Sequence, residues 1–350
     1  MKIVYDNLAF SLQKAGGVSA VWAGLLTNID KKYILKYIEW SNQNIFRKHL
    51  ILPQSKIEHR FSINPKINKI TKAKFRCSNK FIFHSSIYRT CNNPNALNVV
   101  TLHDFIDKTF NQNYFVKTIK WYLMKNSLFD ADAIICVSQN TKKDLLHYLP
   151  KISSSKVYVV NNGKSEEFYR LENRLQTEEF VLFVGKRNDY KNFKVVVEAL
   201  KTETSKKLII VGGGQLEEHE LELLKSLGEE RYSHKELISN EELNTLYNKA
   251  FCLVYPSLYE GFGIPVIEAQ SAGCPVIAAN KSSLPEVLSD SGILLNNVNT
   301  KEIGKAFQRL EDHETRNQHI ELGLQNAARF SWNKMASEYI KVYRELWENN

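Results

Sequence analysis

The stretch Tyr259-Glu260-Gly261-Phe262-Gly263-Ile264-Pro265-Val266-Ile267-Glu268 places two carboxylates eight residues apart across a glycine-rich turn. An apolar strand pattern precedes it, and Pro265 suits a first helical turn, where its missing N–H needs no partner. Free N–H groups at a helix start favour an anion such as phosphate. Because carboxylates are poor phosphate ligands, we expect Glu260 and Glu268 to accept hydrogen bonds from hydroxyl groups. The stretch therefore predicts a pocket for a phosphate attached to sugars, as in a nucleotide sugar.

In its context, Tyr-Pro-Ser-x-x-Glu-Gly-Phe-Gly-x-Pro-x-x-Glu-Ala, this spacing resembles the Glu-x7-Glu motif of retaining GT-B glycosyltransferases, in particular family GT4. The resemblance covers essentially the whole chain and is strongest between Val181 and Leu295. It implies an α/β fold of GT-B architecture, with two Rossmann-like doubly wound domains that face each other across a cleft.

The bulk composition favours a two-domain globular protein. The chain has 350 residues, 43% hydrophobic and 24% charged, which is too long for one ordinary core. No apolar run reaches the length of a membrane-spanning helix, and Lys2 to Asp6 is typical of a first strand and not of a signal peptide. Five scattered cysteines without Cys-x-x-Cys spacing favour free thiols in a reducing cytosol. We therefore expect a cytoplasmic protein. If its basic first half contacts a membrane, we expect it at the inner face of the plasma membrane.

The positive charge is concentrated in the first half. Residues 1–167 carry 25 Lys and Arg against 11 Asp and Glu, a balance of +14, while the whole chain carries +9. The densest basic stretch interleaves cations with Ile67, Ile70 and Phe75; its cations are Lys66, Lys69, Lys72, Lys74, Arg76 and Lys80. An anionic membrane surface and a solvated face without a partner both fit this pattern. No nucleic-acid-binding motif accompanies the charge, so nucleic acid is not an expected partner.

Short apolar runs alternate with helical stretches, which is the pattern of parallel α/β sheets. The first half has strand candidates at Ile3–Tyr5, Phe81–His84, Val99–Leu102, Ala133–Val137 and Val157–Val160. The second half restarts the pattern at Phe180–Val184, Leu208–Val211, Cys252–Tyr255, Pro275–Ala278 and Gly292–Leu295. A polar linker at 166–179 suggests an acceptor-side domain at 1–167 and a nucleotide-sugar-binding domain at 168–331. By the resemblance, a last helix in 332–350 packs back on the first domain.

Two cations follow the first strand of the second half. Arg187 and Lys191 are four residues apart and share a face if the segment is turned or helical. The family has an Arg and a Lys at matching positions, and two cations there would stabilise the charge that grows on a departing diphosphate. Gly212-Gly213-Gly214 lacks the spacing of a dinucleotide loop, so we expect no NAD site.

The first half offers its own candidates at strand ends. Gly16-Gly17 begins a helix whose N–H groups would bind phosphate. His103 resembles the family's first-domain histidine, which contacts the donor sugar, and Asp104 follows it. His84 and Arg89 also follow a strand and, with Asp104, are candidates for acceptor binding. Asp130-Ala131-Asp132 has the Asp-x-Asp form of metal-dependent enzymes, but it precedes a strand, so we interpret it as structural and expect no metal and no cofactor.

The resemblance implies transfer of a sugar from a nucleoside diphosphate sugar to an acceptor hydroxyl, with retention of the anomeric configuration. Glu268 would bind the ribose, Glu260 the donor sugar, and Gly261, Phe262 and Gly263 the phosphate. The form Gly-x-Arg-x-x-Tyr-Lys-Asn looks most like bacterial mannosyltransferases, which favours GDP-mannose and a glycan or polyprenyl-linked glycan acceptor in surface polysaccharide (O-antigen or capsule) synthesis. Two alternatives stay open: an epimerase or phosphorylase of the same fold, and a non-catalytic, membrane-associated partner protein.

Overall fold

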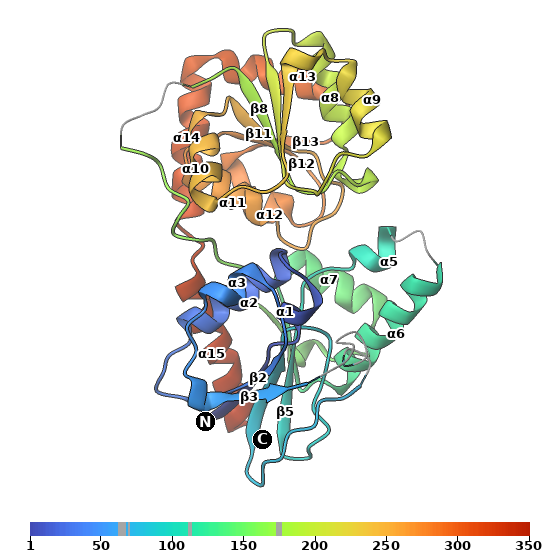
Figure 1. The fold of residues 1–350 in the computed structure, drawn as a ribbon, viewed down its shortest axis with the longest axis vertical. Coiled ribbons are helices and arrows are strands. Elements are labelled where there is room, and N and C mark those ends of the chain that lie inside the picture. Colours follow the sequence, from blue (N-terminus) through green and yellow to red (C-terminus); the bar gives the residue numbers. More distant parts are fainter. Residues whose placement is uncertain (62–67, 69–70, 111–113, 173–176) are drawn as a thin grey trace. The chain divides into compact units, whose positions relative to one another are not determined.

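The computed structural model describes residues 1–61, 68, 71–110, 114–172 and 177–350. Two compact units make up the chain (Figure 1). Unit 1 consists of Met1–Gly163 and Trp332–Asn350, and unit 2 of Lys164–Ser331. The border after Gly163 lies slightly before the one expected at residue 167. The chain therefore leaves unit 1 once, completes unit 2, and returns.

A fully parallel seven-stranded sheet forms the centre of unit 1. Its spatial order is β3-β2-β1-β4-β5-β6-β7. The strands are β1 (Lys2–Asp6), β2 (Ile34–Trp40), β3 (Ile57–Arg60), β4 (Phe81–Ser85), β5 (Ala96–Leu102), β6 (Ala133–Cys136) and β7 (Val157–Val159). The predicted strands are confirmed, and β2 and β3 are additions. The sequence pattern missed β3 because this edge strand is polar and largely exposed.

Helices follow most of these strands. They are α1 (Ala9–Leu12), α2 (Gly17–Asn28), α3 (Ile45–His49), α5 (Ile106–Phe110), α6 (Tyr114–Asp130) and α7 (Gln139–Tyr148), with short 3-10 turns at Gln54–Lys56 and Ser154–Lys156. Ser138 caps α7 by accepting the N–H of Thr141 at 3.0 Å. Its role in the structure is that of a helix cap.

Helix α15 (Trp332–Glu348) packs on unit 1, as predicted. Its buried face includes Met335, Tyr339, Val342 and Leu346. Next to it, Gly24 of α2 allows the Trp332 ring to approach so closely that a Cβ would overlap the indole. The helix thus closes the core of unit 1 although it lies at the far end of the sequence.

Unit 2 is built on a parallel six-stranded sheet of order β10-β9-β8-β11-β12-β13. The strands are β8 (Phe180–Val184), β9 (Lys207–Val211), β10 (Tyr232–Lys235), β11 (Cys252–Tyr255), β12 (Val276–Ala279) and β13 (Ile293–Leu295). Its helices are α8 (Phe193–Thr202), α9 (Glu218–Lys225), α10 (Asn240–Lys249), α11 (Ile264–Ser271), α12 (Leu284–Leu288), α13 (Thr300–Glu311) and α14 (His313–Ala327), with 3-10 turns at Asp189–Lys191, Glu229–Arg231 and Ser289–Ser291. Only β10, which is polar, was not expected from the pattern.

The strand order of unit 2 sets the position of its ligand site. The chain builds outward from β8 to β10 and then crosses to the other side of β8 to place β11. The connections after β8 and β11 therefore diverge at the carboxyl edge of the sheet, and such a switch point is where open parallel sheets bind ligands. In unit 1 the same reversal falls between β1 and β4. Among the described residues, no helix combines the length and the apolar character needed to cross a bilayer.

Candidate functional site

Lys191 and Glu260 meet at the switch point of unit 2. Lys191 belongs to the turn after β8 and Glu260 to the turn after β11, and their side chains form an ion pair. The Lys191 Nζ also donates to the Tyr255 hydroxyl at 3.0 Å and lies 4.9 Å from the centre of that ring. The Lys191 and Glu260 side chains are only 12% and 10% exposed, so both charges are largely withdrawn from water.

Backbone contacts hold the two turns together. The N–H of Leu258 donates to the carbonyl of Tyr190 at 2.7 Å. The Asn192 side chain donates to the Pro256 carbonyl at 2.9 Å, from a residue in left-handed conformation with φ 53°. Asn tolerates this conformation better than most residues. The Lys191–Glu260 pair is therefore fixed by the main chain on both sides.

Two serines from the loop after β12 fix the backbone of Glu260. The Ser282 hydroxyl lies 2.7 Å from the Glu260 carbonyl and 3.2 Å from its N–H, while Ser283 donates to the carbonyls of Glu260 and Phe262 at 3.0 and 2.9 Å. Neither serine belongs to a motif that predicted a site residue from the sequence. They follow β12 at the carboxyl edge of the sheet, and a place directly after a strand is what predicted the other candidate site residues.

The glycine turn after Glu260 leads into α11 as predicted, with Pro265 in the first turn. Gly263 has φ 104°, and a Cβ there would lie 3.0 Å from Leu284, so the position requires glycine. The Phe262 ring packs edge-on against Phe330 at 5.6 Å inside the unit. Any contact of Phe262 with a donor is thus through its backbone, and the phosphate-binding role of Gly261 to Gly263 stays a prediction.

Glu268 lies in α11, one turn beyond Pro265, and is half-buried. Desolvation raises the pKa of its carboxyl to about 7, while the Tyr247 hydroxyl and the charge of Lys164 act in the opposite direction. At neutral pH the group is poised between acid and carboxylate, which makes its ionisation sensitive to a ligand.

Arg187 has partners different from those of Lys191. The Arg187 guanidinium is buried, lies 2.8 Å from the carboxylate of Glu220, and donates to the carbonyls of Gly212, Gly214 and Gln215 at 2.8, 3.2 and 2.9 Å. It thereby holds the glycine loop after β9, in which three consecutive residues have positive φ. Contact of Arg187 with a diphosphate stays a prediction.

Gly16, Gly17, His103 and Asp104 all lie at the carboxyl edge of the sheet of unit 1. Gly17 begins α2, and a Cβ there would meet nothing within 4 Å, so the helix start is open. His103 follows β5, and burial lowers the pKa of its imidazole to about 4, which keeps the ring neutral at physiological pH. The Asp104 carboxylate accepts the N–H of Ile106 at 2.9 Å at the start of α5. The roles of these four residues stay predictions.

His84 requires a correction, and both its side chain and that of Arg89 lie in the core of unit 1. His84 belongs to β4, and its two ring nitrogens bond to Tyr343 at 2.6 Å and Thr101 at 2.9 Å. Arg89 pairs with the buried Asp6 at 2.7 Å. The prediction that the His84 side chain contacts an acceptor is wrong, because His84 is 0% exposed. Arg89 is 4% exposed and lines a hollow together with Lys72 and Tyr88, so its contact with an acceptor stays a prediction.

The Asp-x-Asp sequence is structural, as interpreted. Asp132 accepts the N–H of Asn98 at 2.7 Å and Asp130 pairs with Lys72 at 2.8 Å. In the predicted basic stretch, Lys66, Ile67, Lys69 and Ile70 lie outside the described residues. Lys80 donates to the carbonyl of Trp347 at 2.8 Å, so it serves to anchor α15.

The chain matches known protein families and solved structures. Residues 164–326 match the family model "Glycosyl transferases group 1", and residues 77–167 match "Glycosyltransferase Family 4". The structure is similar over its full length to sucrose-phosphate synthase from Thermosynechococcus elongatus (TM-score 0.76, 18% identity, 100% of both chains). It is also similar to Anabaena HepE in complex with UDP-glucose (TM-score 0.73, 15% identity, 100% of this chain and 99% of that one).

Among curated sequences, the chain is 28% identical to the O-antigen chain mannosyltransferase B of Escherichia coli over 71% of this chain and 70% of that protein. It is 26% identical to the serotype-specific mannosyltransferase WbdA of E. coli over 72% of this chain, but that match spans only 34% of WbdA.

The two parallel-sheet, Rossmann-like α/β domains are those of the GT-B fold. The chain belongs to the group 1 glycosyltransferases of family 4.

Proposed function

We propose that this protein transfers a hexose from a nucleoside diphosphate sugar to a glycan or polyprenyl-linked glycan, with retention of anomeric configuration, in bacterial surface polysaccharide synthesis. The observation that carries the proposal is the Lys191–Glu260 ion pair at the switch point of unit 2, with Glu268 on the adjoining helix. An ammonium with a spare N–H suits a phosphate oxygen, and carboxylates suit sugar and ribose hydroxyls. GDP-mannose is the favoured donor, since curated relatives are mannosyltransferases.

The donor is tested by thermal denaturation of the protein with GDP-mannose, UDP-glucose and other nucleotide sugars. A ligand that binds only the native state at a hundredfold excess over Kd adds about 2.7 kcal/mol to the free energy of unfolding. We expect GDP-mannose to raise Tm most. Failure of every nucleotide sugar to shift Tm would contradict the donor class. A larger shift with UDP-glucose would indicate UDP-glucose as the donor in place of GDP-mannose.

Chemistry is tested with the donor so identified and an acceptor glycan, and NMR of the product reports the anomeric configuration. We expect retention, and turnover that survives EDTA, because Lys191 and main-chain N–H groups supply the positive charge that a metal would otherwise provide. Lys191→Ala should lower kcat at least a hundredfold, since electrostatic stabilisation of this kind contributes roughly 10²–10³. Activity within a few-fold of the parent would refute the role of Lys191.

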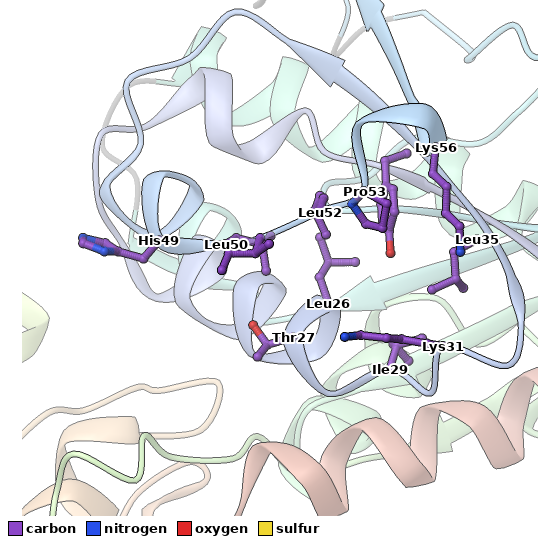
Figure 2. Close-up of a pocket in the computed structure, with 12 residues that line it drawn as sticks. Leu26, Thr27, Ile29, Lys31, Leu35, His49, Leu50, Leu52, Pro53 and Lys56 are labelled. Carbon is purple, nitrogen blue, oxygen red and sulfur yellow. The ribbon is translucent and has the colours of Figure 1, made fainter.

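We further propose that unit 1 contacts an anionic membrane through the loop at residues 50–53. Ile51 is 95% exposed there, beside a hollow of about 270 Å³ with an apolar floor of Leu26, Leu35 and Leu50 (Figure 2). Lys31 and Lys56 also line this hollow. An apolar residue at the surface with cations around it matches the chemistry of an anionic lipid interface.

Vesicle flotation tests this contact. We expect the protein to float with vesicles containing a quarter phosphatidylglycerol and not with pure phosphatidylcholine. Ile51→Ser should weaken flotation, whereas Leu237→Ser, an exposed apolar residue of unit 2, should not. Equal flotation of both variants would show that this loop is not the contact.

A further inference from the structure

The Tyr255 hydroxyl is the third member of the Lys191–Glu260 cluster. Tyr255 is the last residue of β11, and its side chain is buried. Its oxygen accepts an N–H of Lys191 at 3.0 Å, and the same ammonium pairs with Glu260. One ammonium thus holds the phenol and the carboxylate together through charge-assisted hydrogen bonds.

These two contacts determine what the Lys191 ammonium can still offer to a ligand. An ammonium has three N–H donors, of which one serves Glu260 and one serves Tyr255. The Glu260 carboxylate pairs with Lys191 through Oε1. The third N–H of the ammonium suits a phosphate oxygen, and the ion pair fixes the carboxylate beside it.

We propose that Tyr255 is a positioning residue of the donor site, which orients Lys191 toward the leaving diphosphate and Glu260 toward the donor sugar. The inference rests on the proposed function and adds to it a residue that touches neither reacting atom. Because the leaving group gains negative charge as the sugar departs, an ammonium held in place contributes more in the transition state than in the donor complex.

Tyr255→Phe isolates the hydroxyl, since it keeps the ring, its burial and the contact between the ring and the Lys191 ammonium. We expect kcat to fall about tenfold or more, as for loss of a hydrogen bond to a charged group, while KM for the donor changes less than threefold. Tyr232→Phe is the matched control, because Tyr232 is a partly buried tyrosine of the same sheet outside the cluster. Its kcat and KM should equal those of the parent.

A double-mutant cycle shows whether Tyr255 acts through Lys191. If it does, Tyr255→Phe on a Lys191→Ala background costs little further activity, because the orienting hydroxyl has no ammonium left to hold. Additive losses would overturn the inference, as would a Tyr255→Phe variant with parental kcat.

Binding measurements separate this inference from the proposed function. Calorimetric titration of the parent with the same panel of nucleotide sugars comes first, and absence of binding to all of them would contradict the donor site itself. If the parent binds a donor and turns it over, kinetics of Tyr255→Phe decide the inference alone. Circular dichroism and Tm of this variant should match those of Tyr232→Phe, and a much lower Tm would assign the hydroxyl to stability and overturn the positioning role.

Discussion

At the residue scale, the site of unit 2 contains two charged side chains, Lys191 and Glu260, that are largely withdrawn from water and paired with each other. Lys191 and Glu260 neutralise each other, and Tyr255 stays protonated because burial and the nearby Glu260 charge raise its pKa well above the ordinary value. Glu268 differs, since burial raises the pKa of its carboxyl to about 7. The ionisation of this group is therefore set by its surroundings in the fold.

If Glu268 binds the ribose as proposed, its raised pKa predicts that donor binding depends on pH. Ribose hydroxyls donate to a carboxylate better than to a carboxylic acid, so binding favours the ionised form. We expect the donor Kd to fall as pH rises from 6 to 8, by up to about tenfold per unit below the pKa. Calorimetric titration at several pH values measures this. Glu268→Gln should bind more weakly at pH 8 and lose the pH dependence, and a parent with a flat profile would contradict the assignment.

The same group affects stability in the opposite direction. The folded pKa lies above the model value of 4.5, so the native state holds more protons than the unfolded state between these two values. The contribution of Glu268 to the free energy of unfolding therefore decreases as pH rises from about 4.5 through about 7, and is constant above.

At the scale of elements, the loop after β9 and the turn after β8 stabilise each other. Arg187 donates to the carbonyls of the glycine loop, and Gly213 lies so close that a Cβ would overlap the guanidinium and approach the Gly185 carbonyl to 2.7 Å. The loop therefore specifies glycine for two reasons, which are its backbone conformation and the space beside Arg187.

Gly213→Ala should destabilise unit 2 by about 2–3 kcal/mol, from left-handed strain and from displacement of the guanidinium. Gly214→Ala is the matched control, because its φ is also positive at 77° but a Cβ there meets nothing within 4 Å. It should cost only about 1 kcal/mol. Urea unfolding of the two variants measures the difference, and equal midpoints would show that the Arg187 contact adds nothing.

Most elements could be predicted from sequence because apolar strands and strand-end motifs are local signals. β2 and β3 were missed because the first alternates weakly and the second is polar. In the site, Glu260 and Lys191 were predicted to act in one cleft, and they are paired at one sheet edge. The burial of His84 and Arg89 could not be predicted, because their partners, Tyr343 and Asp6, are remote in sequence. Tyr255 was missed because a strand residue gives no sign that its hydroxyl has charged neighbours.

At the scale of the whole molecule, α15 is a part of unit 1 supplied from the other end of the chain. Tyr343 and Tyr339 bond to His84 and Thr101, so a buried polar network as well as an apolar face attaches the helix. Partial removal of such a network leaves buried polar groups without partners, which is costly.

A chain ending at Ser331 should therefore lose the cooperative unfolding of unit 1, while residues 164–331 alone should fold. Hydrogen exchange followed by mass spectrometry separates the two units. We expect the amides of β1 and β4 to lose protection in the truncated chain and those of β8 and β11 to keep it. Protection of β1 equal to that in the full chain would show that α15 is dispensable.

Unit 2 is inserted between the two segments of unit 1. Unit 2 is therefore completed first during synthesis, although unit 1 begins first. During synthesis, unit 1 is missing its last helix until all 168 residues of the insertion have been added. At about 5–20 residues per second this delay is roughly 10 to 30 s. Throughout that interval the surface around Gly24 and His84 lacks the helix that covers it, so the nascent chain offers chaperones an apolar target that the finished protein conceals.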